Sequence, residues 1–387
     1  MDASDAAAIY CDKLLSADDA VAPIADGSLF IFGAALAEPQ AVLWALANRL
    51  RAGELKRLRI MSGPPMACAL DSVLALGLAD CVERISTFVG EGDRGLVSVG
   101  LDQYLPNHFH QLPRLIEEGP PVDVAATVVS PMDGDGYFSF GTNNDSISTA
   151  LRCAKRPIVE VNSFMPRVHG DSRLHVSAVA AVVENHSPFP DFARGVPEPN
   201  DEIIARSVAA MIADGDTIQL GVGGLPMAVC AFLAERRDLG IHTEFLSAAM
   251  VDLVTQGVAT GARKSLHPGK HVFTVAAGDR AMLDVLHDNP AFESYPVSYT
   301  NHQAVIARND NLVSVNSVLE VDLLGQANAE FLAGHQFSGS GGQLDYVRGA
   351  YDARHGKSIL VHRRRDRVVH LGVPRRPSRR HTASEYS

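Results

Sequence analysis

An internal repeat constrains the fold of this chain more than any other feature of its sequence. The tetrapeptide IADG occurs at residues 24–27 and again at residues 212–215. In both places an amphipathic stretch comes before it, and an apolar run, a glycine, a proline and a helical pattern come after it. The same order of helix, strand, glycine turn and helix in both halves predicts two related α/β domains.

A proline-rich segment marks the boundary between the two copies. Residues 186–200 contain four prolines, a composition that favours an extended connection. We therefore predict one domain over residues 1–190 and a second over residues 191–361. A chain of 387 residues is long enough for two such domains.

Short apolar runs predict the strands of these domains. They alternate with helical patterns and have the lengths of buried parallel strands. The runs lie at residues 124–130, 156–162, 271–276 and 311–317. The sequence therefore predicts the α/β class, as two similar open domains with mainly parallel sheets.

The composition changes after residue 361. Residues 362–387 contain eight arginines and only two acidic residues, although the whole chain has a net charge of −11. We expect a disordered basic tail here. The simplest interpretation is a solvated arm that attracts an anionic partner.

The rest of the composition argues against several classes of protein. The net negative charge and the 6% content of aromatic residues argue against a nucleic-acid binder. No apolar stretch approaches the ~20 residues that span a bilayer, and the acidic N-terminus does not resemble a secretory signal. The five cysteines lie far apart, which argues against a zinc site or a disulfide framework. We expect a cytoplasmic enzyme that needs no metal.

A glycine turn in the second repeat is the first candidate for a ligand site. Gly221, Gly223 and Gly224 lie between a predicted strand and a predicted helix. Backbone N–H groups of such a turn can approach an anionic ligand. The spacing matches neither the dinucleotide fingerprint nor the Walker sequence. Taken alone, an ordinary tight turn explains these residues better.

A second glycine cluster and one glutamate are the other candidates. Gly339, Gly341 and Gly342 precede Gln343, and such a cluster indicates either a close contact or a flexible surface loop. Glu244 stands ahead of an apolar run. An acid in that position is most often a charge at the N-terminus of a helix.

Together these segments resemble the acetyl-CoA hydrolase/transferase family, the class I CoA-transferases that include 4-hydroxybutyrate CoA-transferases. The likeness covers roughly residues 10–360 in one consistent order. Its motifs include GAALAEPQAV, SPMDGDGYFSFG, EVNSFMPRVHGDSRLHVS, IQLGVGGLPMAV, GIHTEF, LHPGKHVFT, NPAFESYPVSYTN, NDNLVSVNSVLEVDLLGQ and FSGSGGQLDYVRGA.

The resemblance implies a mechanism and a set of site residues. The family's nucleophilic glutamate falls on Glu244, and a family asparagine that could donate to the oxyanion falls on Asn316. Gly221, Gly223 and Gly224 would line the acyl or thioester site. The CoA loop would contain Gly339, Gly341, Gly342 and Gln343, and Gln219 is a further candidate for a polar contact. Coenzyme A enters as the substrate thioester, so no cofactor is expected.

This resemblance leads to a CoA-transferase as the first hypothesis. It would move CoA between a short-chain acyl-CoA and a carboxylate such as acetate, through an acyl-glutamyl anhydride and a glutamyl-CoA thioester. An acyl-CoA hydrolase and a weakly active relic that still binds CoA are alternatives, and a nucleic-acid binder acting through the tail is a distant one. The family likeness also implies a homodimer or homotetramer that binds neither nucleic acid nor membrane.

Some residues depart from the family pattern. Ser247-Ala248-Ala249 stands where Ser-Asp-Gly is usual, and Leu225-Pro226-Met227-Ala228 stands where Ile-Pro-Asp-Ala is common. We interpret both changes as alterations of the acyl pocket, and reduced turnover is the alternative. The likeness ends near Val361, where the tail has the composition of a shifted GC-rich reading frame. We therefore expect a truncated or frameshifted C-terminus, which sequencing of the locus would test.

Overall fold

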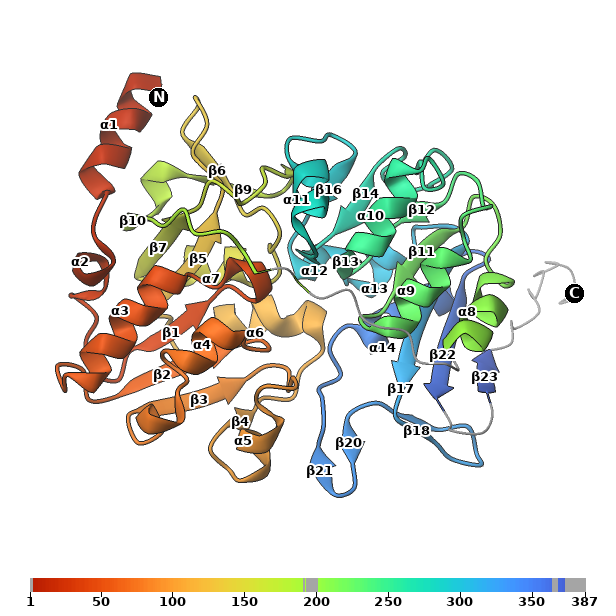
Figure 1. The fold of residues 1–387 in the computed structure, drawn as a ribbon, viewed down its shortest axis with the longest axis horizontal. Coiled ribbons are helices and arrows are strands. Elements are labelled where there is room, and N and C mark those ends of the chain that lie inside the picture. Colours follow the sequence, from red (N-terminus) through yellow and green to blue (C-terminus); the bar gives the residue numbers. More distant parts are fainter. Residues whose placement is uncertain (1–2, 191, 193–200, 364–367, 373–387) are drawn as a thin grey trace, which may run out of the picture.

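A computed structural model describes residues 3–190, 192, 201–363 and 368–372 of the chain (Figure 1). It contains two α/β domains side by side, one built from the N-terminal half and one from the C-terminal half. The predicted class, two open α/β domains with mainly parallel sheets, is confirmed. Of the proline-rich connection, residues 191 and 193–200 lie outside the described residues.

The N-terminal domain is built on a seven-stranded parallel sheet. Its strands have the order β10-β7-β5-β1-β2-β3-β4, with β1 at the centre. The strands are β1 (Leu29–Phe32), β2 (Leu58–Ser62), β3 (Val82–Ser86), β4 (Gln103–Tyr104), β5 (Val124–Val129), β7 (Arg156–Val161) and β10 (Ala181–Glu184).

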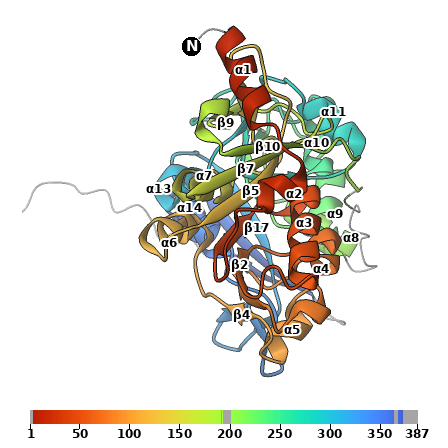
Figure 2. The ribbon, with the colours of Figure 1, turned by 90° about the vertical axis from the view of Figure 1, so that its left-hand side faces the viewer.

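Helices cover both faces of this sheet, because side chains alternate along each strand. Phe30 and Phe32 of β1 pack in one core, and Leu29 and Ile31 pack in the other. The first core is covered by α2 (Ala17–Val21), α3 (Gln40–Arg51) and α4 (Ala67–Asp71), and the second by α1 (Ala3–Lys13), α6 (Leu112–Glu118) and α7 (Ile147–Cys153). Figure 2 shows α6 and α7 on one side of the strands and α3 and α4 on the other.

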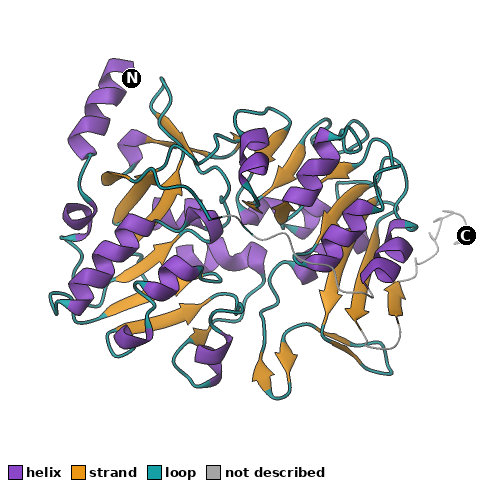
Figure 3. Cartoon of the chain, viewed as in Figure 1, coloured by secondary structure: helices purple, strands orange, loops and turns teal. Residues whose placement is uncertain are grey.

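The C-terminal domain repeats this plan with a five-stranded sheet. Its order is β12-β11-β17-β22-β23, and all neighbours are parallel except β22 and β23. The strands are β11 (Thr217–Leu220), β12 (Gly240–Ile241), β17 (Leu312–Val318), β22 (Lys357–Arg363) and β23 (Val368–Gly372). One face packs on α8 (Asp201–Ala209), α9 (Gly224–Ala231) and α10 (Ala248–Thr255), the other on α13 (Gln303–Ile306) and α14 (Gln343–Asp352) (Figure 3).

Shorter strands join the two domains. A three-stranded sheet has the order β14-β16-β8, and β8 comes from the N-terminal half of the chain. These strands are β8 (His169–Gly170), β14 (His271–Phe273) and β16 (Phe292–Ser294), while β13 (Phe245–Ser247) pairs with β15 (Val275–Ala277).

The remaining helices are α5 (Arg94–Ser98), α11 (Arg280–Leu286) and α12 (Val297–Thr300), with short 3₁₀ turns at Ala35–Ala37, Leu76–Leu78, Phe109–Gln111 and Val176–Ala178. Three strand pairs complete the fold: β6 (Tyr137–Ser139) with β9 (Arg173–His175), β18 (Glu320–Val321) with β19 (Ala327–Asn328), and β20 (Phe331–Leu332) with β21 (His335–Gln336).

The repeated IADG tetrapeptide forms the same turn in both domains. The N–H of Gly27 donates to the carbonyl of Arg57 at 2.8 Å, and the N–H of Gly215 donates to the carbonyl of Arg237 at 2.9 Å. In each copy the preceding aspartate accepts a hydrogen bond from the N–H of the same arginine. Both glycines have positive φ values, 76° and 82°, which explains why glycine ends each copy. The repeat therefore marks equivalent positions in the two domains, each just before the first strand of a βαβ unit.

Part of the predicted basic tail is ordered in the sheet. Strand β22 continues to Arg363, and β23 (Val368–Gly372) pairs with it antiparallel. The described residues of this segment therefore lie in strands at the sheet edge, while disorder of the tail as a whole stays a prediction. Residues 364–367 and 373–387 lie outside the described residues. Within the described residues, none of the helices has the length and apolar character needed to cross a membrane.

Candidate active site

Glu244 lies at the carboxyl end of the C-terminal sheet, just beyond β12. The N–H of Val275 donates to the Glu244 carbonyl at 3.0 Å, and the N–H of Thr243 donates to the carbonyl of Val272 at 2.9 Å. Helix α10 begins only at Ala248. Glu244 is therefore held in the linker between β12 and β13 and is not a first-turn helix acid. Ligands of open α/β sheets bind at this end of the strands.

Two residues from other segments contact the Glu244 carboxylate. The side-chain amide of Asn301, which follows α12, donates from Nδ2 to Oε2 of Glu244 at 2.6 Å. Gly342, at the start of α14, lies so close that a Cβ atom built on it would overlap Oε2. A glycine at position 342 is therefore required for the carboxylate to occupy this place.

His242 connects the segment of Glu244 to that of Asn301. Its Nε2 lies 2.9 Å from the carbonyl oxygen of Thr300. Burial lowers the pKa of His242 to about 3, with a smaller contribution from the charge of Lys264. The imidazole is therefore neutral, and it can donate this hydrogen bond at any ordinary pH.

The environment of Glu244 makes its carboxyl group unusually basic. Burial raises its pKa to about 7, and the neighbouring charges of Asp345 and Asp145 act in the same direction. The hydrogen bond from Asn301 opposes these effects. A carboxylate in a cleft with a pKa shifted this far is a candidate for catalysis.

A cavity of about 730 Å³ lies in front of Glu244. The N-terminal domain supplies most of its wall and the C-terminal domain supplies Glu244. The wall is mainly apolar, and its described residues include no lysine, arginine or histidine. Its apolar side chains include Ile31, Phe32, Met61, Met66, Leu70, Phe88, Phe109, Leu112, Ile116, Phe192, Val222, Phe245 and Val275.

A buried polar segment of the N-terminal domain, residues 142–146, crosses into this site. The carbonyl of Thr142 accepts from the N–H of Ala276 at 2.7 Å, and that of Asp145 accepts from the N–H of Val297 at 3.0 Å. These contacts place the Asp145 side chain at the cavity. Burial raises the pKa of Asp145, while Oδ1 accepts hydrogen bonds from the N–H groups of Ser146 and Ile147.

The structure brings the second glycine cluster to Glu244. Gly341 lines the cavity with a φ of +48°, and a Cβ atom on it would lie 2.9 Å from the Phe88 ring. Gly339 packs against Tyr104 in the same interface. Gln343 instead donates from Nε2 to the carbonyl of Ser317 at 3.0 Å, so this side chain is directed toward β17. The predicted CoA loop is thus an interdomain turn beside the carboxylate.

The first glycine turn reaches the cavity through a different residue. Val222 lines the cavity and is 59% exposed, whereas Gly221 packs against Asn316. Gly223, with a φ of 120°, and Gly224 form the beginning of α9. This turn therefore borders the site through Val222.

Asn316 is occupied by a hydrogen-bond network inside the sheet. Its Nδ2 donates to Oγ of Ser314 at 2.9 Å and to Oε1 of Gln219 at 3.1 Å, and its Oδ1 accepts from Nε2 of Gln219 at 3.2 Å. The amide that contacts Glu244 is that of Asn301, which the sequence reasoning missed. Asn301 ends the motif NPAFESYPVSYTN, so the only available signal was an asparagine in a matching segment.

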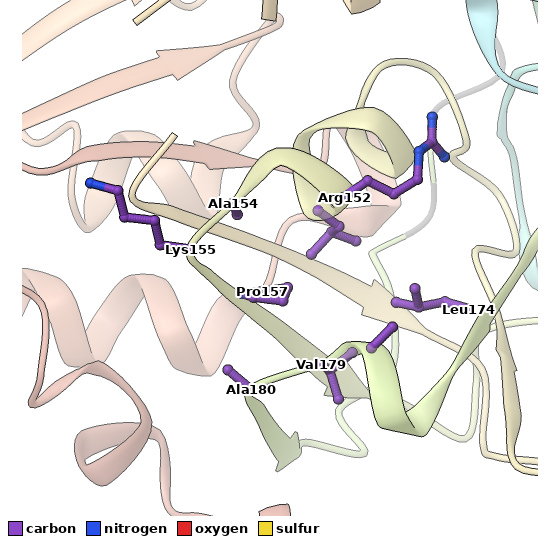
Figure 4. A pocket seen from close by; sticks show the side chains of 9 residues that line it. Arg152, Ala154, Lys155, Pro157, Leu174, Val179 and Ala180 are labelled. Carbon is purple, nitrogen blue, oxygen red and sulfur yellow. The ribbon is translucent and has the colours of Figure 1, made fainter. Parts of the chain in front are cut away.

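A second hollow, of about 480 Å³, lies on the N-terminal domain (Figure 4). It is formed by the end of α7, the start of β7 and residues 178–180. Its two charged side chains are already engaged: Arg152 donates to Oγ1 of Thr149, and Lys155 donates to Oδ1 of Asp123. None of the described residues that line it has a carboxylate or a thiol, so the cavity at Glu244 remains the better candidate. Nowhere in the described part of the chain do three or more His, Cys, Asp or Glu residues gather to hold a metal.

The fold and this cavity define a class of enzyme in which two related α/β domains enclose a cavity with a glutamate carboxylate in its wall. The chain belongs to the acetyl-CoA hydrolase/transferase family: the family's N-terminal domain matches residues 1–190 and its C-terminal domain matches residues 278–367. It is thus an enzyme of the CoA-transferase and acyl-CoA hydrolase group.

Several characterised relatives are similar over most of the chain. It is 37% identical to a succinyl-CoA:cyclohexane-1-carboxylate CoA transferase of Geobacter metallireducens, over 91% of this chain and 79% of that protein. It is 38% identical to a 4-hydroxybutyrate coenzyme A transferase of Clostridium kluyveri, over 91% of this chain and 82% of that protein. The crystal structure of RipA from Yersinia pestis superposes with a TM-score of 0.89 at 44% identity, over 92% of this chain and 82% of that one.

Proposed function

We propose that this protein transfers CoA between a short-chain acyl-CoA and a carboxylate such as acetate, with Glu244 as the nucleophile. The observation that carries the proposal is the Glu244 carboxylate itself, which faces an apolar interdomain cavity and contacts Asn301 and Gly342. The names of relatives support CoA transfer in general.

The first half of the reaction begins with attack by a Glu244 oxygen on the thioester carbonyl carbon. The C–S bond breaks, the electron pair leaves with the CoA thiolate, and an acyl-glutamyl anhydride forms. The thiolate then attacks the Glu244 side-chain carbonyl, which releases the first carboxylate and leaves a glutamyl-CoA thioester. An acceptor carboxylate reverses both steps, so the overall exchange needs no water and no net proton transfer.

Asn301 has a role in the second of these steps. When the thiolate attacks the side-chain carbonyl of Glu244, negative charge develops on a Glu244 oxygen. The amide Nδ2 of Asn301 already donates to Oε2 at 2.6 Å. A neutral donor placed at the developing charge stabilises the transition state without neutralising the nucleophile beforehand.

The raised pKa and the cavity fit the same chemistry. A carboxyl group with a pKa of about 7 is a stronger nucleophile when ionised than an ordinary glutamate. The described part of the wall carries no positive charge and suits a hydrocarbon acyl chain such as butyryl, and exclusion of water would protect the anhydride. Asn316 and the glycines at 221, 223 and 224 remain candidates for secondary contacts. Assembly as a homodimer or homotetramer, and location in the cytoplasm, are further parts of the proposal.

Trapping of the glutamyl-CoA thioester tests this function. The protein is incubated with butyryl-CoA, reduced with borohydride, and digested for mass spectrometry, with Glu244→Gln as the matched control. We expect a CoA adduct or a reduced side chain on the Glu244 peptide of the wild type only. An unmodified Glu244 in a folded protein that binds CoA would favour the relic.

Dependence on acetate separates transferase from hydrolase. With butyryl-CoA as donor, a transferase forms acetyl-CoA in proportion to added acetate and releases little free CoA without it. Release of free CoA at the same rate in the absence of acetate would identify a hydrolase instead.

A further inference from the structure

One pair of side chains, His110 and Asp345, links the two domains beside the site. Asp345 is the third residue of α14 and only 3% exposed. Its Oδ1 lies 2.7 Å from Nδ1 of His110, and its Oδ2 accepts from the backbone N–H of the same histidine at 3.2 Å. Both oxygens of this buried carboxylate thus contact a single residue of the opposite domain.

Adjacent contacts extend this pair into a continuous seam. The N–H of Phe109 donates to the carbonyl of Gly341 at 3.0 Å, and Oγ of Ser340 donates to the carbonyl of Asn107 at 2.6 Å. We refer to residues 107–110 and 340–345 together as the clasp. The turn at Gly341–Gly342 lies within the clasp, and its other side touches Glu244.

The clasp also brings charge to the site. The Asp345 carboxylate contributes to the raised pKa of Glu244, in addition to the larger effect of burial and alongside Asp145. Burial raises the pKa of Tyr346 well above its usual value, and the charges of Glu244 and Asp345 act in the same direction. Around His110 the neighbouring titratable groups are His108, stacked at 6.3 Å, and His302, at 5.8 Å.

We propose that His110 and Asp345 are a positioning pair of this active site. His110 holds Asp345 across the domain interface, and Asp345 in turn fixes the Gly341–Gly342 turn and places a negative charge beside Glu244. The position and the charge environment of the Glu244 carboxylate therefore depend on contact between the two domains. The expected effect of this pair on kcat rests on the proposed function, whereas its effect on the titration of the Glu244 carboxyl does not.

A direct titration of Glu244 tests the charge. Protein labelled with ¹³C at the glutamate carboxyl carbon is titrated by NMR, and the Glu244 signal is assigned by its loss in Glu244→Gln. We expect a midpoint near 7 in the wild type and a lower midpoint in Asp345→Asn, because a like charge is removed. Asp352→Asn, on the exposed face of the same helix, is the matched control and is expected to leave the midpoint unchanged. Equal midpoints in the two variants would overturn the proposal.

Kinetics of His110→Gln test the positioning. This variant keeps Asp345 and loses the imidazole contact, so kcat for CoA transfer should fall about tenfold or more while KM for the acyl-CoA changes little. His335→Gln, at an exposed site on β21, should behave as wild type. A wild-type kcat for His110→Gln would overturn the positioning role. This kinetic test can be carried out even if the Asp345→Asn variant does not fold. If the wild type transfers no CoA, the proposed function fails while the NMR titration still decides the effect on Glu244.

Discussion

The two domains both contain buried glutamates with raised pKa values, but they use them differently. In the N-terminal domain burial raises the pKa of Glu38 and of Glu160 to about 7. Glu38 accepts from the N–H groups of Met66 and Ala69 at 2.6 and 3.2 Å. Glu244 of the C-terminal domain has the same pKa of about 7, yet it accepts from one side-chain amide and faces the cavity.

The difference shows that a perturbed pKa alone does not identify a nucleophile. Glu38 is held at the start of α4, and Glu160 accepts from the N–H of Val42 at 3.2 Å at the start of α3. Their charges are directed at backbone donors of helix ends, where carboxylates are stabilising. Neither is among the described residues that line the cavity at Glu244. Access to the cavity, rather than basicity, distinguishes Glu244 from these two glutamates.

Replacement of Glu244, the proposed nucleophile, should change the rate more than any other substitution. Glu244→Gln keeps the size of the side chain but cannot form the anhydride, so kcat for CoA transfer should fall by about 10⁴-fold. Glu38→Gln, the matched change at a buried carboxyl with the same pKa, should retain most of the activity of the folded enzyme. Acetyl-CoA formation from butyryl-CoA and acetate measures both, and an equal loss in the two variants would contradict the assignment.

A smaller effect is expected at the amide that contacts Glu244. Asn301→Ala removes the donor to Oε2, and the loss of one oxyanion donor costs about 10²–10³-fold in kcat. Asn316→Ala instead opens the network with Gln219 and Ser314, so it should mainly lower the melting temperature. If Asn316→Ala showed the larger loss of kcat at a temperature where both proteins are folded, Asn316 would be the oxyanion donor.

The pH dependence of the rate should report the carboxyl of Glu244. Because its pKa is about 7, the nucleophilic form is lost as the pH falls through 7 rather than through the ordinary value of 4.5. The acid limb of kcat/KM for acyl-CoA should therefore have its midpoint near 7. Asn301→Ala should move this limb to higher pH, since the hydrogen bond from Asn301 lowers the pKa. An acid limb with its midpoint near pH 4.5 would contradict the raised pKa of Glu244.

Much of the fold and part of the site could be predicted from the sequence. The repeat at residues 24–27 and 212–215 and the apolar runs predicted the paired domains, because local turns and buried strands leave regular patterns. The partners of Glu244 could not be found in this way. Asn301 lies 57 residues away and Gly342 is farther still, and their approach depends on how distant loops pack at the domain interface. The strand β23 was not predicted, because its apolar run is short and stands alone in an arginine-rich segment.

The last prediction concerns stability, which should rise when Glu244 loses only its charge and fall when Glu38 loses its whole acceptor group. An acid whose pKa is higher in the folded than in the unfolded protein destabilises the fold when it ionises, so the cost of Glu244 grows between pH 4.5 and 7 and is complete above 7. Glu244→Gln should therefore raise the free energy of unfolding by about 1–3 kcal/mol at pH 8 and leave it unchanged below pH 4.5. Glu38→Ala should lower it by about 1–3 kcal/mol, because the N–H groups of Met66 and Ala69 lose their acceptor. Urea unfolding at the two pH values measures both variants. A loss of stability in Glu244→Gln at pH 8 would mean that Glu244, like Glu38, serves the fold.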